Sequence, residues 1–370
     1  TDLTWETVIT KNIGLDLGFL NNRLNVSFDA YIRDTKDMLM AGKTLPGVYG
    51  ASSPRMNVAD LRTKGWEASV TWGDSFTLAS KPFNYRIMAG IGDNTSKVTK
   101  YDNPNRTLTD PYEGQQLGEI WGYVVDGYFK TDEEARNYKV DQSFVNQMIN
   151  ASALDNGLHA GDLKFVDLDG NNKIEQTTSA NDRKDMKVIG NSLPRYNYNF
   201  GISADWYGID FSVLFQGIGK QNWYPGAETS MFWGPYSRPY ASFIPSDFMS
   251  QVWSEENTDA YFPRPRGYVA LGSNRELAVV NTKYLQNLAY CRLKNLSIGY
   301  TLPDKWLSKI GFEKIRVYFS GENLLTFTKL HSDYIDPEQA SASNSWKTSK
   351  SDANIYPWAK TYSFGVDITF

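Results

Sequence analysis

Cysteine and histidine are nearly absent from this chain of 370 residues. Cys291 is the one cysteine, and His159 and His331 are the two histidines. A single thiol cannot form a disulfide within the chain, and two imidazoles without paired thiols do not make a zinc site. The composition therefore excludes a disulfide scaffold and a metal centre built from cysteine and histidine.

Long apolar runs are also lacking. The sequence contains no apolar run long enough for a transmembrane helix, which needs about 18 residues. A membrane-spanning β-barrel is not excluded, because its strands are apolar only at alternate positions. The net charge of −4 argues against a nucleic-acid partner. Residues 1–6 form no signal segment, so we expect a signal peptide to lie upstream.

Alternation of apolar and polar residues with a period of two is abundant. In residues 24–32 the even positions are Leu, Val, Phe, Ala and Ile, and Asn, Ser, Asp and Tyr stand between them. Residues 13–19, 66–72 and 196–206 repeat the pattern. Successive side chains of a strand point to opposite faces, so these segments are predicted to be strands with one apolar face. The fold class is all-β.

The alternation fits either a soluble β-sandwich or a barrel whose apolar face meets lipid. The polar faces consist of small hydrophilic residues, as in a wet lumen, and aromatic residues gather near the strand ends, as in the girdles of membrane barrels. The sequence predicts nine strands, near residues 13–20, 23–33, 61–73, 83–95, 194–206, 209–217, 285–302, 313–323 and 360–370.

The links between these strands alternate between short and long, which favours the barrel. The short ones include Asn21-Asn22 and Tyr207-Gly208, and the long ones include 34–60, 96–193 and 218–284. Outer-membrane barrels have short periplasmic turns and long external loops, so we expect 96–193 and 218–284 to be extracellular. Nine is an odd number, and a closed bacterial barrel has an even number of strands, so we expect further strands upstream.

Several segments resemble one known family. Residues 290–303 read YCRLKNLSIGYTLP, residues 315–329 read IRVYFSGENLLTFTK, and the chain ends in YPWAKTYSFGVDITF. Together with TWE at 4–6, NIGLD at 12–16 and KGWE at 64–67, these resemble the C-terminal barrel part of SusC-like, TonB-dependent outer-membrane transporters. The resemblance covers nearly the whole chain, in the same order.

The resemblance implies a transmembrane antiparallel β-barrel of about 22 strands, of which residues 1–370 are the C-terminal part. It implies that the signal peptide, a TonB-binding segment, a plug and the first strands lie outside this chain. It also implies the outer membrane of a Gram-negative bacterium of the Bacteroidetes type, contact with membrane lipid, and a SusD-like surface lipoprotein as partner. The terminal Phe370 would serve as the signal that the barrel-assembly machinery reads.

The segment DLDGNNKIE at 167–175 has the spacing of a calcium loop. Asp167, Asp169 and Asn171 offer oxygen ligands at alternate positions, and Lys173 would offer its backbone carbonyl. The usual glycine is replaced by Asn172, which tolerates a left-handed backbone, and Asp182 could stand in for the missing final Glu. Structural Ca²⁺ and a solvated acidic turn without a metal both remain open.

The long segment 218–284 is rich in aromatic residues, among them Trp223, Tyr224, Trp233, Tyr236 and Tyr240. Rings with polar edges can stack on sugars or peptides, and they can equally pack a loop against itself. Residues 131–150 start with a helix signal, Thr131-Asp132-Glu133-Glu134. The sequence shows no nucleophile motif and no catalytic setting for either histidine, so we expect no enzyme activity.

The resemblance implies import of a nutrient oligomer, a glycan or oligosaccharide, across the outer membrane. A peptide importer of the same family is one alternative, and an adhesin or binding receptor anchored by the barrel is another. A diffusion porin is disfavoured by the resemblance. No cofactor other than Ca²⁺ is expected.

Overall fold

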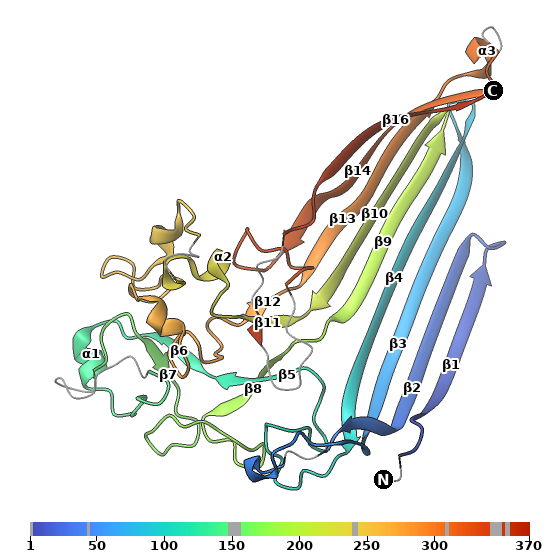
Figure 1. Cartoon of the computed structure of the whole chain (residues 1–370). Helices are drawn as coiled ribbons and strands as arrows, with labels where there is room; N and C mark the ends of the chain where they lie inside the picture. Colours follow the sequence, from blue (N-terminus) through green and yellow to red (C-terminus); the bar gives the residue numbers. More distant parts are fainter. Residues whose placement is uncertain are drawn as a thin grey trace.

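One antiparallel sheet of nine strands dominates the structure. The structure is a computed structural model, and it describes residues 3–42, 45–146, 157–238, 243–307, 311–340, 350–351 and 356–370. The spatial order follows the chain, β1-β2-β3-β4-β9-β10-β13-β14-β16. Figure 1 shows the strands side by side in one slanting layer, with a separate folded body at one end. The strands are β1 Thr7–Phe19, β2 Leu24–Ala41, β3 Arg55–Leu78, β4 Lys81–Lys100, β9 Arg195–Trp206, β10 Ile209–Lys220, β13 Tyr290–Thr301, β14 Lys314–Thr328 and β16 Thr361–Thr369.

The nine predicted strands are confirmed, and most extend further than the alternation indicated. The largest correction is the link 34–60, because β2 continues to Ala41 and β3 begins at Arg55. The pairing register shifts between Thr35 and Met38, and Asp37 has a positive φ of 56°. At such a bulge the side chains change face while the strand continues. The alternation of apolar and polar residues is therefore broken there, and the sequence pattern places the end of the strand too early.

Tight turns join the strands at one end of the sheet. Ala79-Ser80 and Tyr207-Gly208 link their strands with two residues each, all with positive φ, as the favoured two-residue hairpin turns require. Asn21 and Asn22 have φ of 56° and 64°, which confirms a turn there, but the turn has four residues, 20–23, and not the two predicted. The links at the other end are long, so β4 and β9 are joined by residues 101–194 and β10 and β13 by 221–289.

The two faces of the sheet differ in chemistry because directly paired residues point to the same side. One face carries rows of apolar side chains, for example Val26, Val70, Ala89, Phe200 and Phe215. The opposite face carries rows such as Asp29, Glu67, Gly92 and Asn197. On the apolar face Ile13 is 73% exposed and Phe364 83% exposed, so no layer formed by the described residues covers that face.

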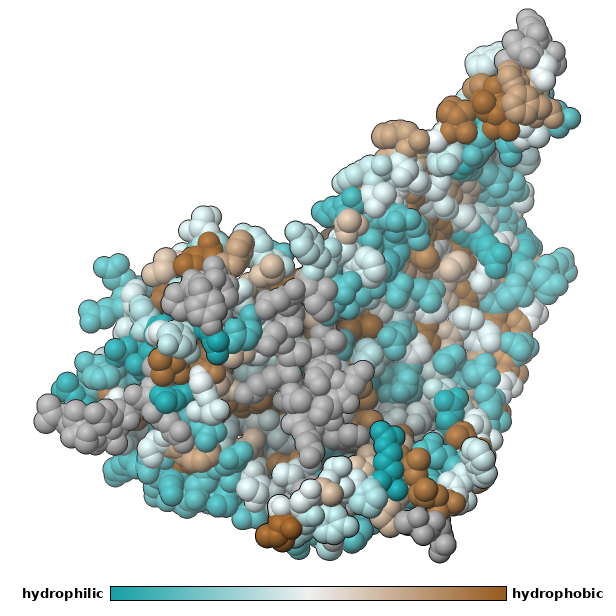
Figure 2. Space-filling view, in the orientation of Figure 1, coloured by the Kyte–Doolittle hydropathy of each residue, from teal (hydrophilic) through white to brown (hydrophobic). Residues whose placement is uncertain are grey.

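The buried hydrophobic core lies in the links and not in the sheet. Its residues come from the segments 101–194, 221–289 and 329–340, and many of them are aromatic. The links fold together into the body at the lower left of Figure 1, while α3 and the C-terminus lie at the opposite end. In Figure 2 hydrophilic side chains cover much of the sheet face that is seen, and hydrophobic ones gather near α3.

Short elements shape these links. Of the helix predicted at 131–150, the first turn is confirmed: Thr131 caps Asp132–Arg136 by accepting a hydrogen bond from the Glu134 N–H at 3.1 Å. Residues 137–146 are not helical, and 147–150 lie outside the described residues. The other short strands are β5 Glu119–Tyr123, β6 Val125–Tyr128, β7 Leu163–Phe165, β8 Met186–Asn191, β11 Asn222–Pro225, β12 Gln286–Asn287 and β15 Lys350–Ser351. The helix at Asp132–Arg136 is α1, and the other α-helices are α2 Ser230–Trp233 and α3 Asp304–Leu307. The 3₁₀ helices are η1 Gly47–Tyr49, η2 Gly234–Tyr236, η3 Phe248–Gln251 and η4 Tyr268–Leu271. Among the described residues, none of the helices has the length and apolarity needed to cross a membrane.

A buried ionic cluster fastens the link after β14 to the polar face of the sheet. The Arg292 guanidinium donates to Asp336 Oδ1 at 2.6 Å, to Glu338 Oε2 at 2.7 Å and to Thr326 Oγ1 at 3.0 Å. Lys294 Nζ lies 2.8 Å from both Glu338 carboxylate oxygens. The side chains of Arg292 and Asp336 are 2% and 4% exposed. The RLK part of the segment 290–303 therefore holds the segment 329–340 in place.

Removing the Arg292 charge should loosen this link. In Arg292→Met the Asp336 carboxylate stays buried without its cation, a loss of about 3–5 kcal/mol for a broken buried pair. We expect faster amide hydrogen exchange over residues 330–338 in the whole protein in detergent. Lys314→Met, which removes an exposed charge at the far end of β14, is the matched control. Equal exchange in the two variants would show that the cluster does not hold the link.

The isolated chain should not behave as a soluble protein. β1 and β16 are the two edges of the sheet, and unpaired edges next to an uncovered apolar face favour association between chains. We expect residues 1–370 expressed alone to aggregate in detergent-free buffer, as judged by light scattering and size exclusion. A monodisperse β monomer with cooperative thermal unfolding in that buffer would contradict a lipid-facing sheet.

Candidate functional site

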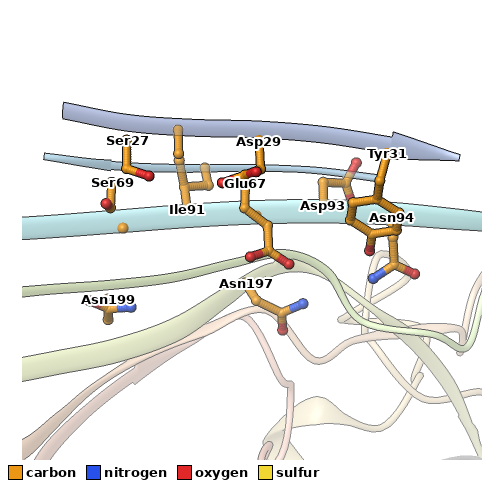
Figure 3. A pocket seen from close by; sticks show the side chains of 13 residues that line it. Ser27, Asp29, Tyr31, Glu67, Ser69, Ile91, Asp93, Asn94, Asn197 and Asn199 are labelled. Carbon is orange, nitrogen blue, oxygen red and sulfur yellow. The ribbon is translucent and has the colours of Figure 1, made fainter. Parts of the chain in front are cut away.

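The polar face of the sheet contains a hollow of about 360 Å³ formed by β2, β3, β4 and β9. Figure 3 shows its side chains projecting from adjacent strands into the same space. They include Ser27, Asp29, Tyr31, Glu67, Ser69, Asn94, Asn197 and Asn199. Hydroxyl, carboxylate and amide groups thus line one wall, with the ring of Tyr31 at its edge.

Glycines make room for these longer side chains. A Cβ on Gly65 would lie 2.4 Å from the Tyr31 ring, and one on Gly92 would lie 3.2 Å from Glu67 Cγ. Asn12 donates to Asp29 Oδ1 at 3.2 Å, so the hollow is lined partly by fixed and partly by free polar groups. This wall was not singled out from the sequence, although the small polar residues at alternate positions were its signal.

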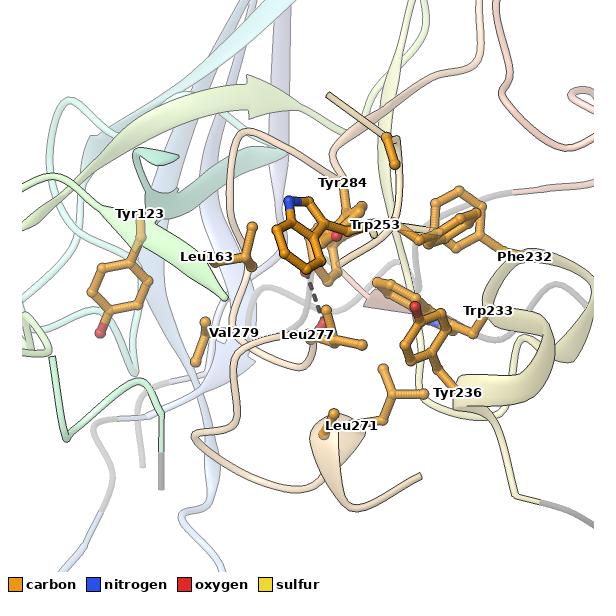
Figure 4. Close-up of a cluster of buried hydrophobic side chains, with 14 of the residues drawn as sticks. Tyr123, Leu163, Phe232, Trp233, Tyr236, Trp253, Leu271, Leu277, Val279 and Tyr284 are labelled. Atoms are coloured by element: carbon orange, nitrogen blue, oxygen red, sulfur yellow. Dashed lines mark hydrogen bonds between the residues drawn. The ribbon is translucent and has the colours of Figure 1, made fainter. Parts of the chain in front are cut away.

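The aromatic residues expected to bind substrate form the core of the link body instead. Trp223, Tyr224 and Trp233 are 0% exposed and Tyr236 is 1% exposed. The Trp233 ring packs against Phe232 and Tyr284, and the Tyr236 ring stacks on Phe262, as Figure 4 shows for part of the cluster. Trp223 and Tyr224 belong to the same buried cluster. The structure thus corrects the expectation of substrate stacking at these four residues, because their side chains are buried in the core. Tyr240 lies outside the described residues.

The polar atoms of these rings are also used internally. Trp233 Nε1 donates to Gly226 O at 2.9 Å, Tyr224 Oη to Leu277 O at 2.8 Å and Tyr236 Oη to Pro263 O at 2.7 Å. A buried ring whose polar edge is satisfied adds both apolar burial and a fixed orientation. The alternative reading of the sequence, in which the aromatic residues pack the loop against itself, describes these four positions.

The acidic segment at 167–175 folds into a tight loop. Asp167 accepts from the N–H groups of Gly170 and Asn172, both at 2.7 Å. Asn172 has a φ of 61°, so it adopts the left-handed backbone expected of it in the place of glycine. Asn171 Nδ2 lies 3.2 Å from Asp169 and from Glu175, and Asn171 Oδ1 accepts from the Lys173 N–H at 2.8 Å.

Asp185 is the third carboxylate of this loop. Oxygen atoms of Asp167, Asp169 and Asp185 lie within 4.8 Å of one another. Asp182, the residue suggested from the sequence, is not in this group, and its carbonyl instead accepts from Thr177. Asp182 and Asp185 both lie beyond the twelve-residue spacing of a calcium loop, and only the path of the chain between 175 and 185 decides which of them reaches the site.

The pKa values of Asp185 and Asp167 shift in opposite directions. Burial, and then the charges of Asp169 and Asp167, raise the pKa of Asp185. For Asp167, burial acts in the same direction but is outweighed by the N–H donors of Asn172, Gly170 and Asn171, which lower its pKa. Converging carboxylates of this kind are the oxygen donors that a hard divalent cation such as Ca²⁺ prefers, so the residues fit the expected ion.

Phe370 ends the chain directly after β16. Its ring is 82% exposed and lies 5.2 Å from the ring of Phe312, in the link between β13 and β14. The last strand places Tyr362, Phe364, Val366 and Ile368 on the apolar face, where Ile315, Val317 and Phe319 pair with them or lie beside them.

Comparisons with known proteins agree with this geometry. The family model described as TonB dependent receptor-like, beta-barrel matches residues 1–324. TonB-dependent receptor P3 of Formosa agariphila is 28% identical over 100% of this chain and 34% of its own length. TonB-dependent receptor SusC of Bacteroides thetaiotaomicron is 24% identical over 100% of this chain and 32% of its own length. The chain therefore spans about a third of the length of these curated relatives.

Among solved structures, the RagAB peptide transporter superposes with a TM-score of 0.70 at 22% identity, covering 100% of this chain and 36% of that chain. This likeness shows the fold. The relatives named here are receptors and transporters and not enzymes. The chain belongs to the TonB-dependent receptor-like β-barrel family of the outer membrane, and within it to the SusC-like type.

Proposed function

We propose that the protein to which this chain contributes imports a nutrient oligomer across the outer membrane, driven through TonB. The observation that carries the proposal is the sheet itself, whose apolar face suits lipid and whose polar face suits a hydrated passage. TonB acts on a part of the protein outside this chain. Membership of the TonB-dependent receptor-like family supports the same function.

We propose an oligosaccharide as the cargo, with a peptide as the alternative. The hollow on the polar face offers Asp29, Glu67 and several Asn and Ser side chains, which can donate to and accept from hydroxyl groups. The same groups can bind the backbone of a peptide, so this wall alone does not separate the two cargoes. A charged surface of this kind disfavours apolar cargo, because its carboxylates would lose water without a partner.

The long links are proposed to face outward and to contact a SusD-like surface lipoprotein. They extend from the same end of the sheet, in the segments 101–194, 221–289 and 329–340 as far as the structure describes them. Their shared aromatic core makes them one body, which can present a fixed surface to a lid. Phe370, at the opposite end, is proposed as the signal for barrel assembly, since it ends an alternating strand on the periplasmic side.

The competing proposal is that the protein is a surface adhesin, which binds a ligand without transporting it. In that case the barrel would merely anchor the link body, and the polar hollow would carry no cargo. The two functions differ in their need for energy, because only import requires TonB.

Deleting TonB should abolish uptake of the oligomer while leaving surface binding intact. Labelled oligosaccharides and labelled peptides of similar length are offered separately to cells carrying the whole protein, and accumulated and surface-bound label are counted. A variant of the hollow, Asp29→Asn with Glu67→Gln, should lower uptake of the true cargo several-fold. The matched control is Asp74→Asn, near the tight-turn end. Uptake unaffected by TonB deletion would contradict energy-coupled import.

We further propose that the loop of Asp167, Asp169 and Asp185 binds Ca²⁺ as a structural clip. Asn171 and the Lys173 carbonyl would complete the set of oxygen donors. The ion would neutralise carboxylates that otherwise repel one another and would hold together a link of roughly a hundred residues that has no disulfide. Because the pKa of Asp185 is raised, protons compete with the ion, and binding should weaken as the pH falls.

Asp167→Ala combined with Asp169→Ala should loosen this link and leave barrel assembly intact. Local hydrogen exchange over residues 160–190 should rise in calcium-containing buffer, to the level that the unsubstituted protein shows with a chelator. Asp182→Ala is the matched control, because this nearby carboxylate is not part of the group. If a chelator changes nothing in the unsubstituted protein, the loop is an acidic turn without a metal.

A further inference from the structure

The apolar face of β1–β4 ends in two rows of charged residues on the side of the long links. Counting the rows of paired residues toward the long links, the row of Ile13, Ala30 and Trp66 is the last one before lysines appear on β1–β3. Beyond it come the row Lys11, Ile32 and Lys64, and then the row Ile9, Asp34, Arg62 and Lys97. Paired residues share a face, so these side chains project to the same side as the apolar band.

The charges in this patch do not balance. Arg62 is paired with Asp34, with Nε 2.6 Å from Oδ1 and Nη2 3.0 Å from Oδ2. Lys11, Lys64 and Lys97 are exposed, and among the described residues their ammonium groups have no carboxylate within 4.0 Å. Lys36, opposite Thr7, continues the patch on β2. A strongly positive patch thus stands on a chain whose net charge is −4.

The position of the patch matches the level of lipid headgroups. Asp93 on β4 pairs with Trp66 and so lies level with the last row before the lysines. The segment of β4 from Phe83 to Asp93 is roughly ten residues, or about 33 Å, long at about 3.3 Å per residue. At a tilt of about 45° this is about 23 Å along the membrane normal, close to the height of about 25 Å of the apolar band in such barrels. The lysine rows therefore begin where the hydrocarbon ends.

We infer that Lys11, Lys64 and Lys97, with Arg62 between them, bind the phosphate groups of a phosphorylated glycolipid in the outer leaflet. The inference rests on the proposed function, in which the long links face outward. Lys11 and Lys64 are two strands apart, about 10 Å, so a headgroup with separated phosphates can contact both while its acyl chains follow the apolar rows below.

Anion recognition alone could be served by free phosphate, but the geometry favours a lipid. The lysines lie on the flank of the sheet that carries the exposed Ile13 and Leu15, and not in an enclosed cavity. An anion without acyl chains would gain only the screened attraction of separated ammonium groups. A lipid adds burial of its chains on the adjacent apolar rows.

The test compares two triple variants of the whole protein extracted from outer membranes in mild detergent. Lys11→Gln, Lys64→Gln and Lys97→Gln remove the patch. Lys81→Gln, Lys305→Gln and Lys314→Gln remove three exposed lysines near the tight-turn end and serve as the control. Phosphorylated glycolipid retained per protein is measured by mass spectrometry. We then add back the intact glycolipid, its enzymatically dephosphorylated form, or inorganic phosphate.

The patch variant should retain at least about tenfold less phosphorylated glycolipid than the control, since each lysine near a charged lipid surface contributes severalfold. Dephosphorylated glycolipid should bind equally weakly to both variants, and inorganic phosphate at millimolar concentration should not displace the lipid. Equal retention by the two variants would overturn the inference, and so would displacement by phosphate alone.

A separate measurement tests the orientation on which the inference rests. Ser273→Cys, an exposed position in the link 221–289, is introduced together with Cys291→Ser and treated on intact cells with an impermeant thiol reagent. Labelling places the long links outside. If the position stays unlabelled, the proposed orientation fails, whereas lipid retention by the purified variants still reports on the patch itself.

Discussion

The register of nine antiparallel strands is the constraint on which the rest of the structure depends. Away from its bulges and its two edges, the backbone N–H and C=O groups of the sheet pair with neighbouring strands, and the period of two fixes which side chains share a face. A slip of one residue would exchange the rows of Val70 and Glu67 between lipid and water. The apolar band, the polar hollow and the lysine rows are all positions within this single register.

Tight turns at one end of the sheet force the other end to carry all the long links. Those links cannot rely on disulfides, because Cys291 is the one cysteine of the chain. They are held by a core of aromatic rings and by buried charges. Arg266 lies between Asp162 and Glu276, with its Nε 3.0 Å from Glu276 Oε1, and so joins the two longest links.

This ionic group is costly to bury, although Arg264, with its Nε 3.9 Å from Asp162 Oδ1, adds a second positive charge to it. Burial is the largest influence on Glu276 and raises its pKa to about 7, although Arg266 acts in the opposite direction. A carboxyl group whose pKa is raised on folding stabilises the folded state at pH values below its unfolded pKa. This stabilisation is lost as the pH rises through the folded pKa, about 7 for Glu276. The aromatic core does not titrate near neutral pH. Its contribution to the stability of the link body therefore stays constant over the physiological pH range.

Period-two alternation was enough to predict the strands, their order along the chain and the two faces of the sheet, because these depend on local geometry and on pairing between neighbours. The motif at 290–303 indicated the family, but not that Arg292 and Lys294 fasten the link after β14. The partners of those side chains lie more than forty residues away, and no local spacing encodes them.

The same limit explains the errors in the links. Aromatic residues at 223–236 carry no signal that separates a binding surface from a core, because burial is decided by segments distant in the chain, such as Phe262 and Tyr284. The acidic loop was recognisable from its spacing, yet its third carboxylate, Asp185, comes from beyond that spacing. The sheet could be read from the sequence because its contacts repeat with a fixed period, whereas the contacts of the link body join distant segments without any period and become visible only in the folded chain.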